Sequence, residues 1–279
     1  METLFNYFEN ITSQHRSLIL VGGLTLFWLL EGALPLFKFK YKKWKHAVPN
    51  IFFTLTTIVI NFSLAFLLVE TSDWVQENQF GIINWIPNLP LWAYILLGVL
   101  LLDFIGAYLA HYVEHKVKPL WMVHLVHHTD HHVDTTTANR HHPLESVIRF
   151  VFTLAGVFII GTPIAIVFIY QSLSLIATQF SHANIKLPNK VDKILSYILV
   201  SPNMHKVHHH YMLPYTDSNY GNIFSIWDRL FGTFMKLDPK LIVYGVDTFP
   251  DEKANGKIGM LLKQPFHKYR KPTSLNASK

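Results

Sequence analysis

The feature that most limits what this chain can fold into is a series of long apolar runs with almost no charge. Three of them cover residues 17–37, 51–69 and 91–110. The first has Glu31 as its only charge and would extend about 31 Å as a helix, enough to cross the hydrocarbon core of a bilayer. The third also carries one charge, Asp103. The sequence therefore predicts an integral membrane protein.

A fourth apolar stretch, residues 147–180, is too long for one simple span and is interrupted by Gly161-Thr162-Pro163. Proline removes a helical N–H donor and disfavours helix in the residue before it. We therefore expect a helical hairpin here that enters and leaves the membrane on the same side.

Basic residues in the short loops predict the orientation, because cytoplasmic loops carry an excess of lysine and arginine. The loop after the first span contains Lys38, Lys40, Lys42, Lys43 and Lys45. The loop between the second and third spans contains Asp73 and Glu77 but no lysine or arginine. The third span should then end on the cytoplasmic side. The hairpin returns the chain to that side, and Lys186, Lys190 and Lys193 follow it.

These runs divide the chain into four parts. They are residues 1–110 with three spans, 111–146 as a first histidine-rich cap segment, 147–180 as the hairpin, and 181–279 as a second histidine-rich cap segment with a C-terminal tail. The predicted fold class is all-α, with a helical stem in the membrane and a cytoplasmic histidine-rich helical cap. We expect no signal peptide at the N-terminus and disorder only in the last ten or so residues.

Composition excludes several classes of site and partner. Without cysteine the chain can hold no disulfide, thiolate zinc site, iron–sulfur cluster or cysteine nucleophile. Charged residues make up 15% of the chain, against about 25% in a soluble domain. The net charge of +6 comes from residues that flank apolar segments, which indicates an anionic membrane surface rather than nucleic acid.

Histidines are concentrated in one part of the chain, with 14 of the 17 between His111 and His210. They form three motifs: His111-Tyr-Val-Glu-His115, His124-Leu-Val-His127-His128 and His205-Lys-Val-His208-His209. Residues three and four apart share a helix face, so each motif should point two or three imidazoles at one spot. Imidazole binds iron, zinc, copper or nickel, and eight nitrogens exceed the four that a tetrahedral zinc uses. The pattern favours a two-metal centre.

Two other functions are compatible with part of this pattern. The first motif matches H-x-x-E-H, a metalloprotease signature in which Glu114 would be the general base. That function would leave the other two motifs unused. A membrane metal transporter or metal-binding protein should place its ligands near mid-membrane, within the spans. Nearly all the histidines lie beyond the predicted span ends, which favours an enzyme.

In their order and spacing, the three motifs resemble the fatty acid hydroxylase superfamily, which includes sterol desaturases, C4-methylsterol oxidases and alkylglycerol monooxygenase. Further segments extend the resemblance over about residues 101–234. They are His142-Pro143-Leu144-Glu145, Ser181-His182-Ala183-Asn184, Asn219-Tyr220-Gly221 and Trp227-Asp228-Arg229-Leu230-Phe231-Gly232-Thr233.

The resemblance implies a non-haem di-iron oxidoreductase that hydroxylates or desaturates a lipid. It would use dioxygen and two electrons. The implied cofactor is iron, two ions per chain, and the implied ligands are His111, His115, His124, His127, His128, His142, His182, His205, His208 and His209. Some members have a second histidine four residues after the equivalent of His182. Lys186 stands at that position here, which leaves the ligand count open by at least one.

Several residues beside the motifs have less specific roles. We expect His131, His132, His141 and His210 to be supporting or solvated histidines rather than ligands. Asp103 should face the protein interior, in a functional or a packing role, and Asp228 and Arg229 are predicted to form a structural pair. The chain contains no flavin or dinucleotide fingerprint, so its electrons should come from a separate donor. The lipid remains open among fatty acyl chains, sterols, ether lipids, carotenoids and aminolipid head groups.

Overall fold

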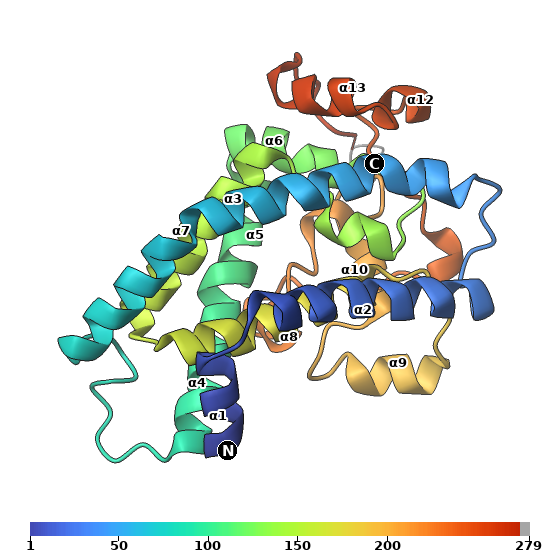
Figure 1. Ribbon diagram of the computed structural model, residues 1–279. Helices are drawn as coiled ribbons and strands as arrows, with labels where there is room; N and C mark the ends of the chain where they lie inside the picture. The colour runs from blue at the N-terminus through green and yellow to red at the C-terminus, as the bar shows by residue number, and fades with distance from the viewer. Residues whose placement is uncertain (274–279) are drawn as a thin grey trace.

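The computed structural model describes residues 1–273, and the expected disordered tail lies largely outside this range. Regular structure within the described residues is helical, with two isolated bridge pairs, Pro35–Ile185 and Leu199–Phe224. Five helices are long and apolar enough to cross a membrane. The all-α fold class, with a stem of three spans and a helical hairpin, is confirmed (Figure 1).

The first two spans are α2, Ser13–Ala33, and α3, Lys43–Glu77, after a short helix α1, Glu2–Glu9. The α2 helix ends four residues before the apolar run does, because Pro35 disfavours helix in the residue before it. The α3 helix is much longer than its apolar run. Helical propensity continues into the polar residues at both ends, whereas the run marks only the part that is apolar enough for lipid.

The third span is a continuous helix, Leu91–Lys116, with a change of pitch in its middle. It consists of α4, Leu91–Leu102, a π-helical segment at Asp103–Leu109, and α5, Ala110–Lys116. Asp103 begins the π-helical segment, and its buried carboxylate accepts hydrogen bonds from the backbone N–H groups of Ile223 and Phe224 and from the indole of Trp227. Asp103 therefore faces the interior as predicted, where it binds the C-terminal loop to the stem.

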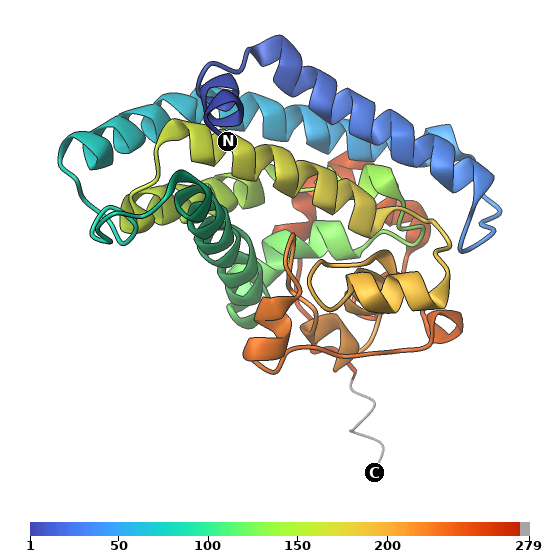
Figure 2. The ribbon, with the colours of Figure 1, turned by 90° about the horizontal axis from the view of Figure 1, so that it is seen from below.

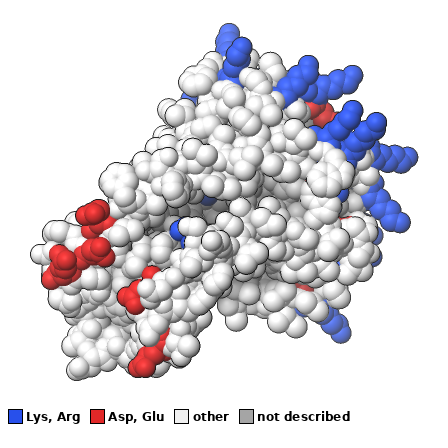
Figure 3. Space-filling view, viewed as in Figure 1, with Lys and Arg blue, Asp and Glu red and all other residues white. Residues whose placement is uncertain are grey.

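The hairpin consists of α7, Pro143–Ile160, and α8, Ile164–His182. Gly161 ends α7 with a φ of +81°, a left-handed conformation that glycine adopts without strain, and Pro163 precedes α8. The two helices diverge from this turn, so that α7 packs against α3 and α8 against α2 (Figures 1 and 2). A hollow lies between these two pairs of helices on the face in Figure 3.

The cap is made of short helices that connect to the ends of the spans. They are α6 (Lys118–His128), α9 (Asn189–Leu195), α10 (Pro202–His208), α11 (Ile226–Leu230), α12 (Glu252–Asn255) and α13 (Ile258–Lys263), with 3₁₀ turns at Thr135–Asn139, Tyr215–Asp217, Pro239–Leu241 and Gln264–Phe266. Glu31 of α2 joins stem and cap. Its buried carboxylate accepts from the N–H groups of Thr135 and Asn184 and pairs with Lys43 at 2.7 Å.

The predicted pair of Asp228 and Arg229 does not form. The carboxylate of Asp228 accepts instead from the backbone N–H groups of Tyr220 and Gly221, at 2.7 and 2.9 Å. The Arg229 guanidinium donates to the carbonyl of Ser196 and lies 4.0 Å from the centre of the Phe234 ring. Adjacent residues on a helix point in different directions, so these two side chains serve different neighbours.

Charge is distributed unequally between the two ends of the stem. Lysines and arginines gather at the end that holds the Lys38–Lys45 connection, and acidic residues gather at the opposite end, where α3 finishes (Figure 3). This is the asymmetry that the loop composition predicts.

Candidate metal centre

Nine histidines converge from four helices, and from the residue that follows one of them, at one end of the stem. α5 contributes two of them, α6 three, α10 two, and the last residue of α8 and the residue after α10 one each. Proline starts α6, α7 and α10, where a missing N–H costs no helical hydrogen bond. Ser201 caps α10 by accepting from the N–H of Met204, and this orients the helix that carries the third motif.

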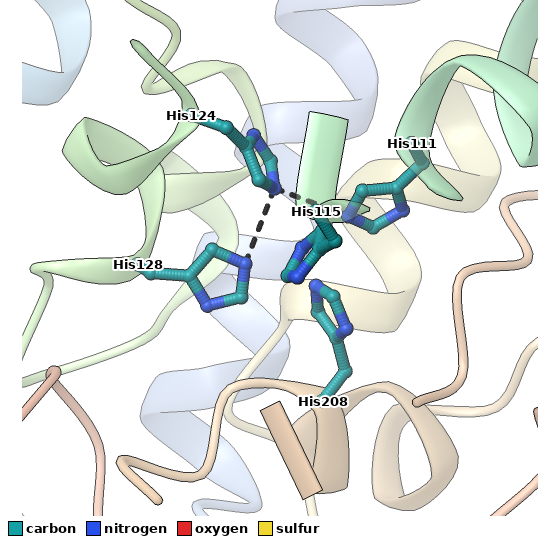
Figure 4. Close-up of side chains that lie close together, drawn as sticks. All are labelled: His111, His115, His124, His128 and His208. Carbon is teal, nitrogen blue, oxygen red and sulfur yellow. Dashed lines mark hydrogen bonds between the residues drawn. The ribbon is translucent and has the colours of Figure 1, made fainter. Parts of the chain in front are cut away.

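The first group contains five buried histidines whose ring nitrogens lie within 4.8 Å of one another: His111, His115, His124, His128 and His208. Figure 4 shows their rings directed toward a common centre. The Nε2 atom of His124 lies 3.1 Å from Nε2 of His111 and 3.2 Å from Nε2 of His128.

The second group contains four buried histidines: His127, His182, His205 and His209. The Nε2 atom of His182 is at its centre, 3.1 Å from Nε2 of His127, 3.0 Å from that of His205 and 3.2 Å from that of His209. The two groups are neighbours, since the rings of His128 and His209 have centroids 4.8 Å apart.

The two identical motifs divide their histidines between the groups in a reciprocal way. In the second motif the i, i+4 pair His124 and His128 joins the first group, while His127 joins the second. In the third motif the corresponding pair His205 and His209 joins the second group, while His208 joins the first. Each of these two motifs thus points two imidazoles at one spot, as expected, and its remaining imidazole at the other group. The i+3 position turns toward a different centre from the i, i+4 pair.

Most rings of the first group are held by hydrogen bonds on the nitrogen that faces away from the centre. Nδ1 of His111 contacts the carbonyl of Tyr220 at 2.9 Å, and Nδ1 of His208 contacts that of Ser218 at 2.7 Å. Nδ1 of His115 lies 3.2 Å from Asp217. Such bonds fix the orientation and tautomer of metal-binding imidazoles.

His124 is held by a buried carboxylate, with Nδ1 2.8 Å from Oε1 of Glu145. Arg149 donates to the same oxygen at 3.0 Å and to Oε2 of Glu114 at 2.7 Å. Oε1 of Glu145 is the acceptor of the hydrogen bond from Arg149. It accepts from His124 as well, so Nδ1 of His124 carries the hydrogen. Arg149 thus holds two buried carboxylates on the side of His124 that faces away from the first group.

These contacts place two lone pairs opposite each other. The carbonyl of Tyr220 can only accept, so Nδ1 of His111 also carries its hydrogen, and Nε2 of each ring presents a lone pair. Two lone pairs 3.1 Å apart repel unless a cation lies between them. Two ligands at a right angle on one ion, each about 2.1 Å from it, are about 3.0 Å apart. The histidines of the first group therefore fit a bound metal ion.

Burial favours the neutral form of the histidines on the cap helices, which is the form that binds metal. Burial, reinforced by neighbouring histidines, holds the pKa of His124, His127 and His128 well below its ordinary value. The same causes lower the pKa of His205 and His209.

Glu114, the general base of the protease alternative, is buried. Its Oε2 pairs with Arg149 and lies 3.9 Å from Nδ1 of His124, on the far side of the ring from Nε2. A general base must reach the proton it abstracts, and a water on a metal in the first group would lie on the Nε2 side. This position is unsuited to the protease role.

The remaining histidines lie outside both groups. Nδ1 of His142 accepts from the N–H of Leu144 as the cap of α7, and its Nε2 contacts the carbonyl of Leu262, so both nitrogens are engaged. His132 stacks on Tyr41, and Nδ1 of His210 accepts from the N–H of Val243. His131 contacts Asn255, and His141 lies against the ring of His127.

Sequence reasoning missed the groups that support the rings. Glu145 stands in a recognised segment, but nothing in its pattern shows that it reaches His124. Asp217, Ser218 and Arg149 lie outside every motif, and Tyr220 stands in a recognised segment whose pattern does not show that its carbonyl reaches a histidine. Their roles depend on contacts between segments as far apart as His111 and Tyr220, and no local pattern reports such contacts.

Comparison with known proteins agrees with this geometry. Residues 95–233 match the family model described as fatty acid hydroxylase. The chain is 31% identical over 185 residues to alkylglycerol monooxygenase from Xenopus tropicalis, covering 66% of this chain and 39% of that protein. It is 25% identical over 150 residues to an ornithine lipid hydroxylase from Rhizobium tropici, covering 54% and 44% of the two chains. No solved structure matches the chain.

A third relative is a putative methylsterol monooxygenase from Dictyostelium discoideum, 25% identical over 148 residues, which are 53% of this chain and 54% of that protein. The chain thus spans about two fifths to one half of the length of these curated relatives. In each case the matched part covers half of this chain or more.

Proposed function

Because residues 95–233 place this integral, multi-pass membrane protein in the fatty acid hydroxylase superfamily, we propose that it is a di-iron oxygenase that hydroxylates or desaturates a lipid. Hydroxylation would convert a C–H bond, dioxygen, two electrons and two protons into an alcohol and water. Desaturation would remove two hydrogens from the lipid and reduce dioxygen to two waters with the same two electrons and two protons. Both need a separate electron donor.

The observation that carries this proposal is the pair of adjacent histidine groups with ring nitrogens directed inward. In the first group His111 and His124 present opposed lone pairs, and in the second three rings approach Nε2 of His182. Each group offers at least four nitrogens, which supports one metal ion in each. Iron bound there would supply the activation of dioxygen and the oxidation of an unactivated C–H bond.

The protein's own residues would hold the rings and keep water out. Hydrogen bonds from Nδ1 to Glu145, Tyr220 and Ser218 leave Nε2 free for a metal. The nine histidines are buried, so that bulk water is excluded from the space they surround. A dry site with oriented ligands is what the protein contributes to catalysis by a bound metal.

The position of the site supports a lipid substrate. Both groups include a residue from the end of a membrane-spanning helix, His115 of the third span and His182 of α8. The hollow between the α3–α7 and α2–α8 pairs opens on the face drawn in Figure 3. In the same view in Figure 1 it lies in front of α5. A lipid chain could reach the groups from the bilayer by this route. We propose that this end of the stem faces the cytoplasm, because the lysine-rich loop lies there.

Neither alternative function gains support from the site. A transporter should hold its ligands near mid-membrane, whereas these histidines lie at helix ends. A protease would use one metal and a base that faces it, whereas Glu114 lies behind His124.

The test is product formation in cells that express the chain or its variants, with lipids profiled by mass. We expect a lipid whose mass rises by one oxygen or falls by two hydrogens, only with dioxygen present. His208→Ala should abolish the product, and the exposed His267→Ala, which lies outside both groups, should not. Glu114→Gln should retain activity. Full activity in His208→Ala, or turnover without dioxygen, would refute the proposal.

A further inference from the structure

The cap exposes apolar side chains on two segments outside the five spans. We define the apolar rim as Ile194, Tyr197, Ile198, Ile226, Leu230 and Phe231, each of which is exposed. The first three lie on α9 and the residues after it, and the others on or next to α11. Ile198 and Leu230 are each 67% exposed, an unusual exposure for apolar residues that face water.

The two segments form one surface. The carbonyl of Ile198 accepts from the N–H of Ser225, and the carbonyl of Ser196 accepts from both Ser225 and Arg229. The Arg229 guanidinium also lies 5.1 Å from the centre of the Tyr197 ring. These contacts hold the two segments of the apolar rim next to each other.

The rim packs against the third span. The ring of Phe231 stacks on that of Phe104, with centroids 5.5 Å apart, and Phe104 also contacts Trp227. Phe104 lies six residues before Ala110, where the apolar run ends, and this places Phe231 at most about 9 Å inside the boundary of the run along the helix axis. Amphipathic segments at a membrane surface bury their apolar side chains to a depth of about 5–10 Å.

The charges around the rim also suit a lipid surface. Lys186, Lys190 and Lys193 are exposed next to it. The acidic residues of the same segments, Asp192 and Asp228, are buried, and each accepts backbone N–H groups. The rim therefore offers apolar side chains and cations to its surroundings, which is the combination that binds anionic lipids.

We propose that the apolar rim lies in the boundary between head groups and acyl chains of the bilayer that the stem spans. The rim is a docking surface of the cap for lipid. Its first segment, residues 194–198, precedes Ser201, the cap of α10, so that anchoring the rim holds His205 and His208 at a fixed height above the membrane. α12 and α13 lie on the opposite side of the molecule and take no part (Figure 1).

The full chain without native cysteine allows a direct test with single introduced thiols. Ile198→Cys and Leu230→Cys are labelled with an environment-sensitive fluorophore after reconstitution into bilayers of phosphatidylcholine and phosphatidylserine. Lipids with a spin label on the acyl chain quench from within the bilayer, and iodide quenches from water. Leu241→Cys is the matched control, since Leu241 is 61% exposed and its neighbours pack on Phe37 and Phe39 of the lysine-rich connection.

We expect quenching by the labelled lipid at residues 198 and 230 to exceed that at 241 by about twofold or more, with the reverse order for iodide. Lys190→Glu combined with Lys193→Glu should reduce the lipid quenching at 198 in anionic bilayers. Equal iodide quenching at all three positions would overturn the proposal, because water would then cover the rim. Protection from both quenchers would also overturn it, because a protein surface would then cover the rim.

Discussion

At the scale of single residues, the least expected feature is the pair of carboxylates, Glu114 and Glu145, on the side of His124 that faces away from the first group. Arg149 holds Glu145 and Glu114, and Glu145 in turn holds Nδ1 of His124. A carboxylate on the outer nitrogen makes the imidazole more basic and fixes its tautomer. Glu145 is therefore a positioning residue for the first histidine group.

Glu145→Gln should weaken iron binding in the first group by about 10–100-fold, because the amide keeps the volume but removes the charge that supports His124. The measurement is iron retained by purified protein during titration with a chelator. Glu252→Gln is the matched control, since Glu252 is 62% exposed on its side chain and lies only beside His132. Unchanged iron retention in Glu145→Gln would show that the contact is structural.

The histidine motifs could be predicted residue by residue, but their partition could not. Helical spacing brings His124 and His128 together and leaves His127 at a different angle, and only the placement of α6 and α10 shows that His127 meets His209. His142 illustrates the limit of motifs, because the same residue that a segment marks as a candidate ligand caps a helix here.

At the scale of elements, the π-helical segment of the third span begins where the stem binds the C-terminal loop. It begins at Asp103, whose carboxylate accepts three hydrogen bonds from residues 223–227. The apolar pattern of residues 91–110 predicts a span but gives no sign of the change in pitch. The contacts of Asp103 are also invisible in that pattern, because their donors lie more than a hundred residues later.

Asp103→Asn should lower the free energy of unfolding by about 1–3 kcal/mol, because the amide accepts through one oxygen and leaves a buried N–H donor without its partner. Thermal unfolding in detergent measures this, with Asp73→Asn at the exposed end of α3 as control. Membrane insertion should be unaffected in both variants. If Asp103→Asn melted at the same temperature as the parent protein, the attachment of the C-terminal loop to the stem would not depend on Asp103.

At the scale of the whole molecule, the hairpin explains why motifs separated by a membrane segment can share one centre. α7 begins beside the second motif and α8 ends at His182, and the helices diverge between these points to pack on different partners. Hydropathy and Pro163 predicted the turn. The divergence of α7 and α8 could not be predicted, because it depends on which neighbouring helices each of them packs against.

The hairpin also makes a prediction about topology. Cysteines introduced at the exposed Leu144 and Lys186 should be labelled from the same side of a sealed membrane, and one at the exposed Asn78 from the other side. Labelling of positions 144 and 186 from opposite sides would separate the histidine motifs and exclude a shared centre.

The central claim is that two adjacent histidine groups each bind one iron ion. Metal analysis of protein purified from iron-rich medium tests it most directly, with His115→Ala and His205→Ala each removing a ring from one group. The account predicts close to two irons per chain in the parent protein and close to one in each variant. One zinc per chain, unaffected by iron in the medium, would contradict it.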